Sequence, residues 1–413
     1  MRGRSVLSLL LLLALLSAGT ATSEVTDKYL QAALRIYPAR LELTAEYSYP
    51  IGFEAAIDEV KAQAAEYRLT PMDVASIEFT ATSPFPPKNF RVRFPVTSTP
   101  GESGVFPEGS RFKLVPCEPV VVACSLFQKA EFFDSAIEVC QSLAEARGYR
   151  FGKTVLVRVI TWQVEKKQEM WLEALLPISA ANKKDFAVWC GPGAHEFSVS
   201  ALSTALWSCG KTLTVLDAKS IETLASKTAD CIAFPGGLAN EQDAAISETG
   251  VKAVRAFVDA GGGYLGICAG AYLASATVQW EGATVRYRLG LYNGTAIGSI
   301  HQIAKYPGSS VAGLKLSDMP LFDGLLAHRT VFYFGGPYFE GVTAKDTMAT
   351  YHINSKPAII SSTFGKGRVV LVGPHIEYDL TSYRDIVGWP ESSGVKDPEP
   401  DWDILDRLLR LLK

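Results

Sequence analysis

A single cysteine between two glycines, in the run Gly266-Ile-Cys-Ala-Gly270, constrains this chain more than any other feature. A short apolar segment precedes Cys268 and an alanine-rich segment follows it, so the pattern predicts a strand, a tight turn and a helix in succession. Small flanking residues tolerate a strained backbone and leave the side chain at the turn accessible. The N-terminus of a helix also favours the thiolate, which is the nucleophilic form of cysteine. Cys268 is therefore a candidate nucleophile.

A histidine and a carboxylate occur together much later in the chain, in Gly373-Pro-His-Ile-Glu377. On a strand, residues two apart point to the same face. We therefore expect Glu377 to orient His375 while His375 deprotonates Cys268, which is how enzymes activate a thiol nucleophile.

These motifs resemble those of class I glutamine amidotransferases, and they resemble more closely the amidotransferase-like domain at the N-terminus of some biotin–protein ligases. The resemblance covers about residues 184–400 and includes two further glycine motifs, Phe234-Pro-Gly-Gly237 and Gly335-Gly336. It implies that Cys268 is the nucleophile, His375 the base and Glu377 the residue that orients the base.

The same resemblance implies an oxyanion hole and a substrate pocket. The backbone N–H groups of Gly237 (or Gly236) and Ala269 would hold the oxyanion. Gly335 and Gly336 would lie in a loop over the pocket.

Two positions depart from the glutaminase pattern. Tyr272 replaces the glutamine that helps hold substrate, and Ile376 replaces the proline between histidine and glutamate. The resemblance therefore implies the catalytic machinery, with Tyr272 as a candidate substrate contact, but not glutamine as the substrate.

Strands alternate with helices over residues 184–413, which predicts an α/β fold. The resemblance implies that this fold is a flavodoxin-like, class I amidotransferase-like parallel sheet with helices on both faces. Loops 191–194, 235–237 and 266–270 fall at the carboxyl ends of the predicted strands, where such folds bind ligands. His195 follows the first of these loops, and it either faces the site or simply begins a helix.

The preceding segment, residues 38–180, repeats a β-α-β-β pattern twice, and Pro95 and Pro177 end the matching last strands. This α+β arrangement resembles the gyrase-inhibitory-protein-like effector-binding fold, which implies a small-ligand cleft between the two halves. The halves form either one sheet each or one joined sheet. Tyr47, Phe132, Phe133 and Trp171 either line the cleft or pack in the core. Residues 23–37 are expected to form a short helical lead-in.

The first 22 residues have the composition of a signal peptide: Arg2 and Arg4, the apolar run 6–16, and small residues up to position 22. We expect an exported protein that is secreted, periplasmic or in the lumen of the secretory pathway. No later apolar stretch is long enough to span a bilayer after cleavage. An uncleaved N-terminal anchor is the alternative.

Composition limits the other partners and cofactors. A formal charge of −3 argues against a nucleic-acid-binding surface. The glycines at 261, 263 and 266 precede a strand rather than a helix, so they do not fit a dinucleotide fingerprint. No CxxC or clustered Cys/His spacing indicates a metal site, and we expect no cofactor. The seven cysteines fit either one free thiol plus up to three disulfides or mostly buried thiols.

The sequence therefore favours an exported Cys-His-Glu amidase or hydrolase that acts on a small-molecule or amide substrate. The alternative is a non-catalytic small-molecule-binding protein with a vestigial triad, and a third interpretation is a component of a protein assembly. The protein partner of such an assembly cannot be identified from the sequence.

Overall fold

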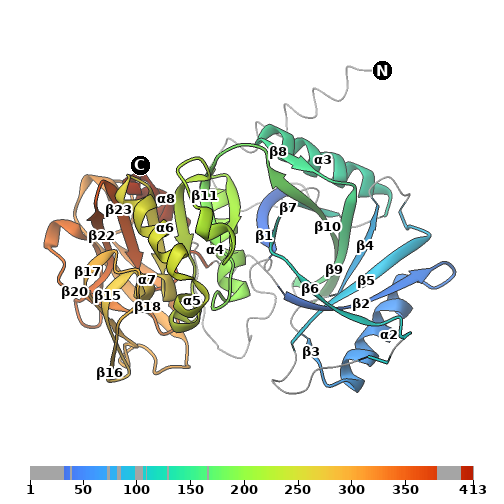
Figure 1. Cartoon of the computed structure of the whole chain (residues 1–413), viewed down its shortest axis with the longest axis horizontal. Coiled ribbons are helices and arrows are strands. Elements are labelled where there is room, and N and C mark those ends of the chain that lie inside the picture. The colour runs from blue at the N-terminus through green and yellow to red at the C-terminus, as the bar shows by residue number, and fades with distance from the viewer. Residues whose placement is uncertain are drawn as a thin grey trace.

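A computed structural model describes residues 32–37, 40–71, 75–80, 85–97, 106–107, 109–127, 130–164, 167–378 and 401–412. The predicted signal peptide, residues 1–22, lies outside the described residues. The chain forms two large sheets with α4 between them (Figure 1). None of the helices in the described segments is long and apolar enough to cross a bilayer.

The first large sheet contains ten strands in the order β1-β7-β10-β9-β4-β5-β2-β6, with β3 paired to β5 and β8 paired to β10. Its elements are β1 (Ala32–Tyr37), β2 (Arg40–Ser48), α2 (Phe53–Glu66), β3 (Thr70–Pro71), β4 (Ser76–Thr80), β5 (Asn89–Thr97), β6 (Lys113–Cys117), β7 (Val120–Phe127), η1 (Ala130–Phe132), α3 (Phe133–Ala146), β8 (Tyr149–Phe151), β9 (Thr154–Val164) and β10 (Lys167–Ala180).

The two predicted repeats are β2-α2-β4-β5 and β7-α3-β9-β10, and they share one joined sheet. Strands β4 and β9 pair antiparallel at its centre. The strand that precedes each repeat crosses to the other one: β1 pairs with β7 and β6 pairs with β2. This exchange links the two repeats at both edges of the sheet.

The predicted helical lead-in is wrong for Ala32–Tyr37, which forms β1; the rest of the lead-in lies outside the described residues. Its side chains alternate between two buried environments, with Tyr37 on one face and Leu34 and Ile36 on the other. Pairing with β7 satisfies its backbone, so tertiary contacts override the local preference.

Aromatic side chains fill the core on the helix-covered face of this sheet. Phe133 of α3 packs against Phe79, Phe85 and Phe127, with ring centroids 4.8–5.9 Å apart. Tyr47 is also buried in that core. Phe133 and Tyr47 therefore pack in the core. The side chain of Trp171 lies outside the described residues.

The second large sheet has nine strands in the order β12-β11-β13-β14-β23-β22-β21-β18-β19, and a small sheet has the order β16-β15-β17-β20. Their elements are β11 (Lys184–Trp189), α4 (Glu196–Ser208), β12 (Leu213–Leu216), η2 (Ser220–Thr223), β13 (Ala229–Phe234), α5 (Ala239–Ala245), α6 (Glu248–Asp259), β14 (Gly263–Ile267), α7 (Ala269–Ala274), β15 (Ser275–Trp280), β16 (Ala283–Val285), β17 (Tyr292–Gly298), β18 (Ser310–Leu316), η3 (Pro320–Phe322), β19 (His328–Tyr333), β20 (Tyr338–Glu340), η4 (Ala344–Asp346), β21 (Thr347–Tyr351), β22 (Pro357–Phe364), β23 (Gly367–Val372), α8 (Trp402–Leu409) and η6 (Arg410–Leu412).

The predicted α/β class and its helices on both faces are confirmed. Strand residues alternate between two cores, one shared with α4 and α8 and the other with α5, α6 and α7. The sheet is parallel only from β12 to β23, since β22, β21, β18 and β19 extend it antiparallel. Short connections such as the β22–β23 turn require antiparallel pairing.

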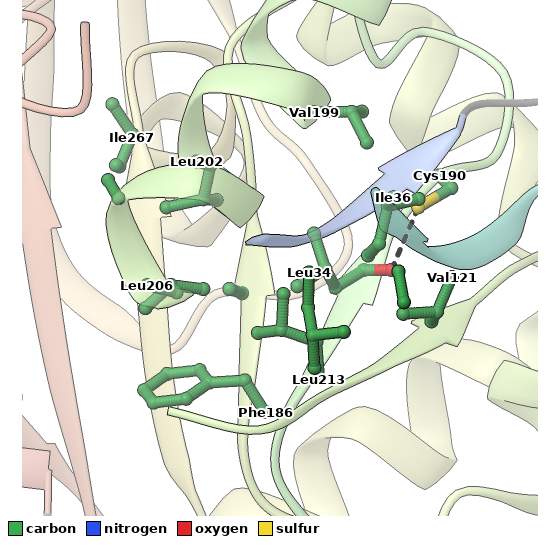
Figure 2. Close-up of a cluster of buried hydrophobic side chains, with 14 of the residues drawn as sticks. Leu34, Ile36, Val121, Phe186, Cys190, Val199, Leu202, Leu206, Leu213 and Ile267 are labelled. Carbon is green, nitrogen blue, oxygen red and sulfur yellow. Dashed lines mark hydrogen bonds between the residues drawn. The ribbon is translucent and has the colours of Figure 1, made fainter. Parts of the chain in front are cut away.

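Helix α4 contacts both large sheets. Leu34 and Ile36 of β1 share a hydrophobic cluster with Val199 and Leu202 of α4 (Figure 2). The Ile36 amide also donates a hydrogen bond to Ser203 Oγ at 3.1 Å. The helix that lies between the sheets is therefore held by both of them.

Candidate active site

The strand–turn–helix prediction around Cys268 is confirmed. Strand β14 ends at Ile267, Cys268 occupies the N-cap position of α7, and its φ of 49° lies in the left-handed region that side chains rarely adopt. Such strain persists only where the surroundings impose it.

Close backbone contacts impose this turn. A Cβ on Gly266 would lie 2.5 Å from the carbonyl oxygen of Gly270, and one on Gly270 would lie 2.2 Å from that of Phe234. The Cys268 amide donates to the Val372 carbonyl of the neighbouring β23 at 2.8 Å. Both glycines are therefore required for the turn to pack against the ends of β13 and β23.

The Cys268 side chain is 6% exposed and borders a cavity. Its thiol lies 3.5 Å from the Phe334 carbonyl oxygen and donates to it. The sulfur is thus held on the side of the turn from which a small molecule can approach.

His375 and Glu377 form a buried pair. Their Nδ1 and Oε1 atoms are 2.7 Å apart, and the side chains are 3% and 0% exposed. The segment that carries them follows β23 rather than forming the strand that we expected, because only His375 makes a bridge, to Phe332. Trp402 of α8 donates to the Glu377 carbonyl at 2.9 Å and anchors the segment.

Electrostatic interactions place a proton on His375. Burial by itself lowers the pKa of His375, but the Glu377 carboxylate and the Cys268 sulfur oppose it and raise that pKa to about 10. Nε2 of this imidazole is buried, and a side-chain hydrogen bond with Cys268 contributes to the raised pKa of His375. The arrangement therefore offers a proton donor beside the thiol.

A cavity of about 290 Å³ brings these groups together. Its lining comes from six parts of the chain and comprises His195, Phe197, Ser198, Gly237, Cys268, Pro307, Ser309, Phe332, Phe334, His375 and Tyr378. His195 both caps α4 and lines the cavity, so the two alternatives for it are not exclusive. Burial lowers the pKa of His195, and the neighbouring His375 lowers it further.

The predicted oxyanion residues lie beside the cavity. Gly237 has a φ of 149° and bridges to Ala194, but the bridge's hydrogen bonds run from His195 N to Gly236 O and from Leu238 N to Gly193 O. Neither bond uses the Gly237 N–H. Ala269 is the first residue of α7, where helix N–H groups lack partners within the helix.

Gly236 packs against the imidazole of His375. A Cβ there would lie 2.7 Å from His375 Cε1 and 2.8 Å from Ser198 Oγ. Only glycine leaves room for the imidazole at this position.

Tyr272, Gly335 and Gly336 lie next to the cavity but do not line it. The Tyr272 side chain is buried, and its hydroxyl donates to the Gly335 carbonyl at 2.9 Å. A Cβ on Gly336 would lie 1.8 Å from the Gly373 carbonyl oxygen, so that glycine permits close backbone packing. Their roles in substrate binding stay predictions.

Several residues that line the cavity were not predicted from the sequence. Ser198 lies one helical turn after His195, and Tyr378 follows Glu377 directly; their hydroxyl oxygens are 2.9 Å apart. Helical spacing from His195 was a usable signal for Ser198. Pro307 and Ser309 come from a loop that no motif marks.

The described residues include all seven cysteines, and none of them forms a disulfide; Cys124, Cys140, Cys190 and Cys231 are buried. The alternative of mostly buried thiols therefore describes this structure. In the described segments, no group of three or more His, Cys, Asp or Glu side chains is arranged to hold a metal ion.

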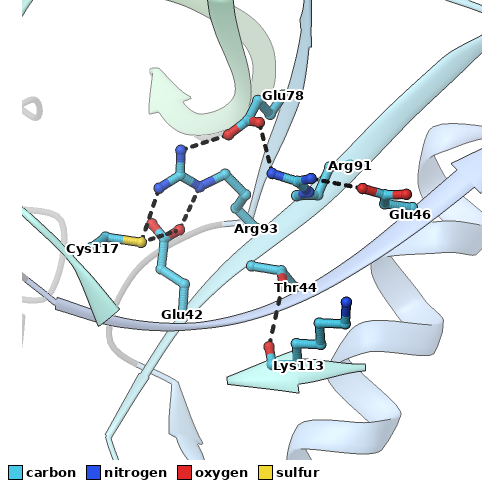
Figure 3. Close-up of polar contacts among 8 residues, drawn as sticks. All are labelled: Glu42, Thr44, Glu46, Glu78, Arg91, Arg93, Lys113 and Cys117. Atoms are coloured by element: carbon cyan, nitrogen blue, oxygen red, sulfur yellow. Dashed lines mark hydrogen bonds and ion pairs between the residues drawn. The ribbon is translucent and has the colours of Figure 1, made fainter. Parts of the chain in front are cut away.

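A second cavity, of about 390 Å³, lies on the first sheet. Arg91 and Arg93 of β5 bond to Glu78 of β4 at 3.1 and 2.7 Å, and they also pair with Glu46 and Glu42 of β2 (Figure 3). That a ligand binds this sheet stays a prediction.

The parallel strands, the cysteine turn and the His–Glu pair define an α/β, amidotransferase-like protein. The chain belongs to the family described as "Biotin-protein ligase, N terminal", whose model matches residues 185–394, just over half of the sequence. The amidotransferase-like resemblance is thus confirmed.

Two curated proteins are similar to this chain in sequence. An uncharacterized protein of Chlamydia muridarum is 32% identical over 171 residues, which are 38% of this chain and 64% of that protein. The biotin–protein ligase of Schizosaccharomyces pombe is 29% identical over 200 residues, which are 44% of this chain and 29% of the ligase. The chain thus spans less than two thirds of the length of either relative.

Solved structures show weaker similarity. A glutamine amidotransferase aligns with 49% of this chain and 94% of its own at 19% identity, with a TM-score of 0.36. The C-terminal domain of EcmrR aligns with 37% of this chain and 98% of its own at 17% identity, with a TM-score of 0.28. The effector-binding resemblance of residues 38–180 stays a prediction.

Proposed function

We propose that this protein is an exported cysteine-dependent amidase or related hydrolase. The observation that carries the proposal is the meeting, at one cavity, of a strained cysteine turn and a buried His–Glu pair from a distant segment. Export is proposed from the basic, apolar and small-residue pattern of residues 1–22.

In the proposed reaction, the Cys268 thiolate attacks the carbonyl carbon of an amide. The N–H groups of Gly237 and Ala269 hold the oxyanion that forms. As the C–N bond breaks, His375 transfers its Nε2 proton to the leaving amine, which leaves a thioester on Cys268.

Water completes the cycle. The now neutral His375 takes a proton from a water molecule as that water attacks the thioester carbonyl. The C–S bond breaks, the carboxylic acid leaves, and the thiolate and the imidazolium are restored. Glu377 keeps its hydrogen bond to Nδ1 throughout and therefore orients the ring.

The rate of Cys268 alkylation by iodoacetamide at neutral pH tests the activated thiol. We expect His375→Ala to slow labelling at Cys268 by about tenfold or more, because the imidazolium no longer stabilises the thiolate. His301→Ala is the matched control, since His301 forms an exposed pair with Glu281 at 2.7 Å and does not line the cavity.

If Cys268 reacts no faster than an ordinary thiol and His375→Ala changes nothing, the catalytic proposal fails and the binding-protein alternative takes its place. Intact-mass spectrometry with amide and ester libraries then reports turnover directly. An acyl adduct that appears on the wild type and is absent from Cys268→Ala supports the thioester.

A further inference from the structure

We infer that the acyl group accepted by Cys268 is uncharged and largely apolar, and that it is not the acyl group of a free amino acid such as glutamine. This inference rests on the proposed function and names the substrate class for that same site.

Aromatic and apolar groups form most of the cavity wall. Phe197 comes from α4, Phe332 from β19, and Phe334 and Pro307 from loops. The Phe332 ring lies 5.6 Å from the His375 ring and 5.4 Å from the Tyr378 ring, between centroids. A flat or branched apolar group gains contact area on every side of such a wall.

Charge at the cavity is balanced from within. Among the described residues, no Asp, Glu, Lys or Arg side chain lines it. The positive charge of His375 already faces the Glu377 carboxylate and the Cys268 sulfur, and His195 is held toward its neutral form. Among the described lining residues, an ammonium or carboxylate on the substrate would therefore lose water without gaining an Asp, Glu, Lys or Arg partner, and burying an unpaired charge is costly.

Neutral hydrogen-bonding groups are present instead. The hydroxyls of Ser198 and Tyr378 pair with each other at 2.9 Å, and Ser309 adds a third hydroxyl at the rim. Hydroxyls and backbone amides suit the carbonyl and N–H of a neutral amide.

The cavity volume of about 290 Å³ lies at the lower end of the range for small-molecule sites, which is about 300–1,000 Å³. It holds one small acyl group, so the leaving amine extends toward the opening.

Two chloromethyl ketones test the inference on the full-length protein. One carries a neutral phenylethyl group, and the other copies the side chain of glutamine with its free ammonium and carboxylate. The rate at which each reagent modifies Cys268 is divided by the rate at which the same reagent modifies a small free thiol. This corrected rate removes the difference in intrinsic reactivity between the reagents. We expect the corrected rate to be at least about tenfold higher with the neutral reagent, because the cavity does not solvate the charges.

The outcomes separate this inference from the proposed function. Equal or faster modification by the charged reagent overturns the substrate class but keeps the activated thiol. If neither reagent modifies Cys268 faster than the free thiol, the proposed function itself is overturned, and the inference with it.

A variant that adds a charge gives an independent reading. Ser309→Arg places a cation at the cavity rim, and Ser310→Arg, one residue further along and not in the lining, is the matched control. We expect only Ser309→Arg to shift the corrected preference toward a chloromethyl ketone that carries a carboxylate. If both variants, or neither, shift that preference, the cavity does not select substrates by charge.

Discussion

Replacing Glu377 by glutamine tests the electrostatic account of the site most directly. The amide side chain of the Glu377→Gln variant would keep an acceptor for His375 Nδ1, which now lies 2.7 Å from Oε1, but the negative charge would be gone. Only the Cys268 sulfur then opposes the effect of burial, and we expect the pKa of His375 to fall below neutral pH. At neutral pH the imidazole would become neutral and would no longer serve as the proton donor.

The effect of Glu377→Gln on the free energy of unfolding follows from the coupling between folding and proton binding by His375. In the wild type the folded-state pKa of His375 is raised to about 10, whereas an unfolded histidine titrates near 6.5. The stabilisation is therefore complete below about pH 6.5 and is lost as the pH rises toward 10. Since one pH unit corresponds to about 1.4 kcal/mol, the wild type should lose about 2–3 kcal/mol more than the variant between pH 7 and 9.

Urea unfolding at pH 7, 8 and 9 measures this difference. Glu281→Gln is the matched control, because it removes the carboxylate of the exposed His301 pair, and exposed pairs contribute little. Parallel pH profiles for the wild type and Glu377→Gln would show that His375 is not held protonated, and the electrostatic reasoning would be refuted.

Two further substitutions test the packing around the site. Gly236→Ala should displace the imidazole of His375, because its Cβ would lie 2.7 Å from Cε1; we expect Cys268 alkylation to slow by about tenfold, and an unchanged rate would contradict this. Ser203→Ala removes the acceptor of the Ile36 amide between the two halves, and we expect a loss of about 1–3 kcal/mol in urea unfolding; a loss confined to activity, with unchanged unfolding, would contradict it.

Local sequence was sufficient for the elements of the proposed catalytic site. Glycines at 266 and 270 permit the backbone approach that the Cys268 turn requires, and they are readable as a motif because they lie within five residues of each other. His375 and Glu377 are two residues apart, so their mutual orientation is also a local property. The same holds for the two β-α-β-β repeats, whose pattern depends on short-range periodicity.

What only the tertiary structure decided is the set of neighbours that these elements acquire. Ala32–Tyr37 forms a strand because β7 and α4 cover it, and its own composition does not require that. The cavity wall joins Ser198 to Tyr378, 180 residues away, and Tyr272 turns to the Gly335 carbonyl rather than lining the cavity. Such contacts come from the packing of distant segments, in which burial and hydrogen bonding across the sheet outweigh local preference. Cys268, His375 and Glu377 can therefore be identified from the sequence as a proposed catalytic set, whereas the shape and charge of the cavity beside them exist only in the folded chain.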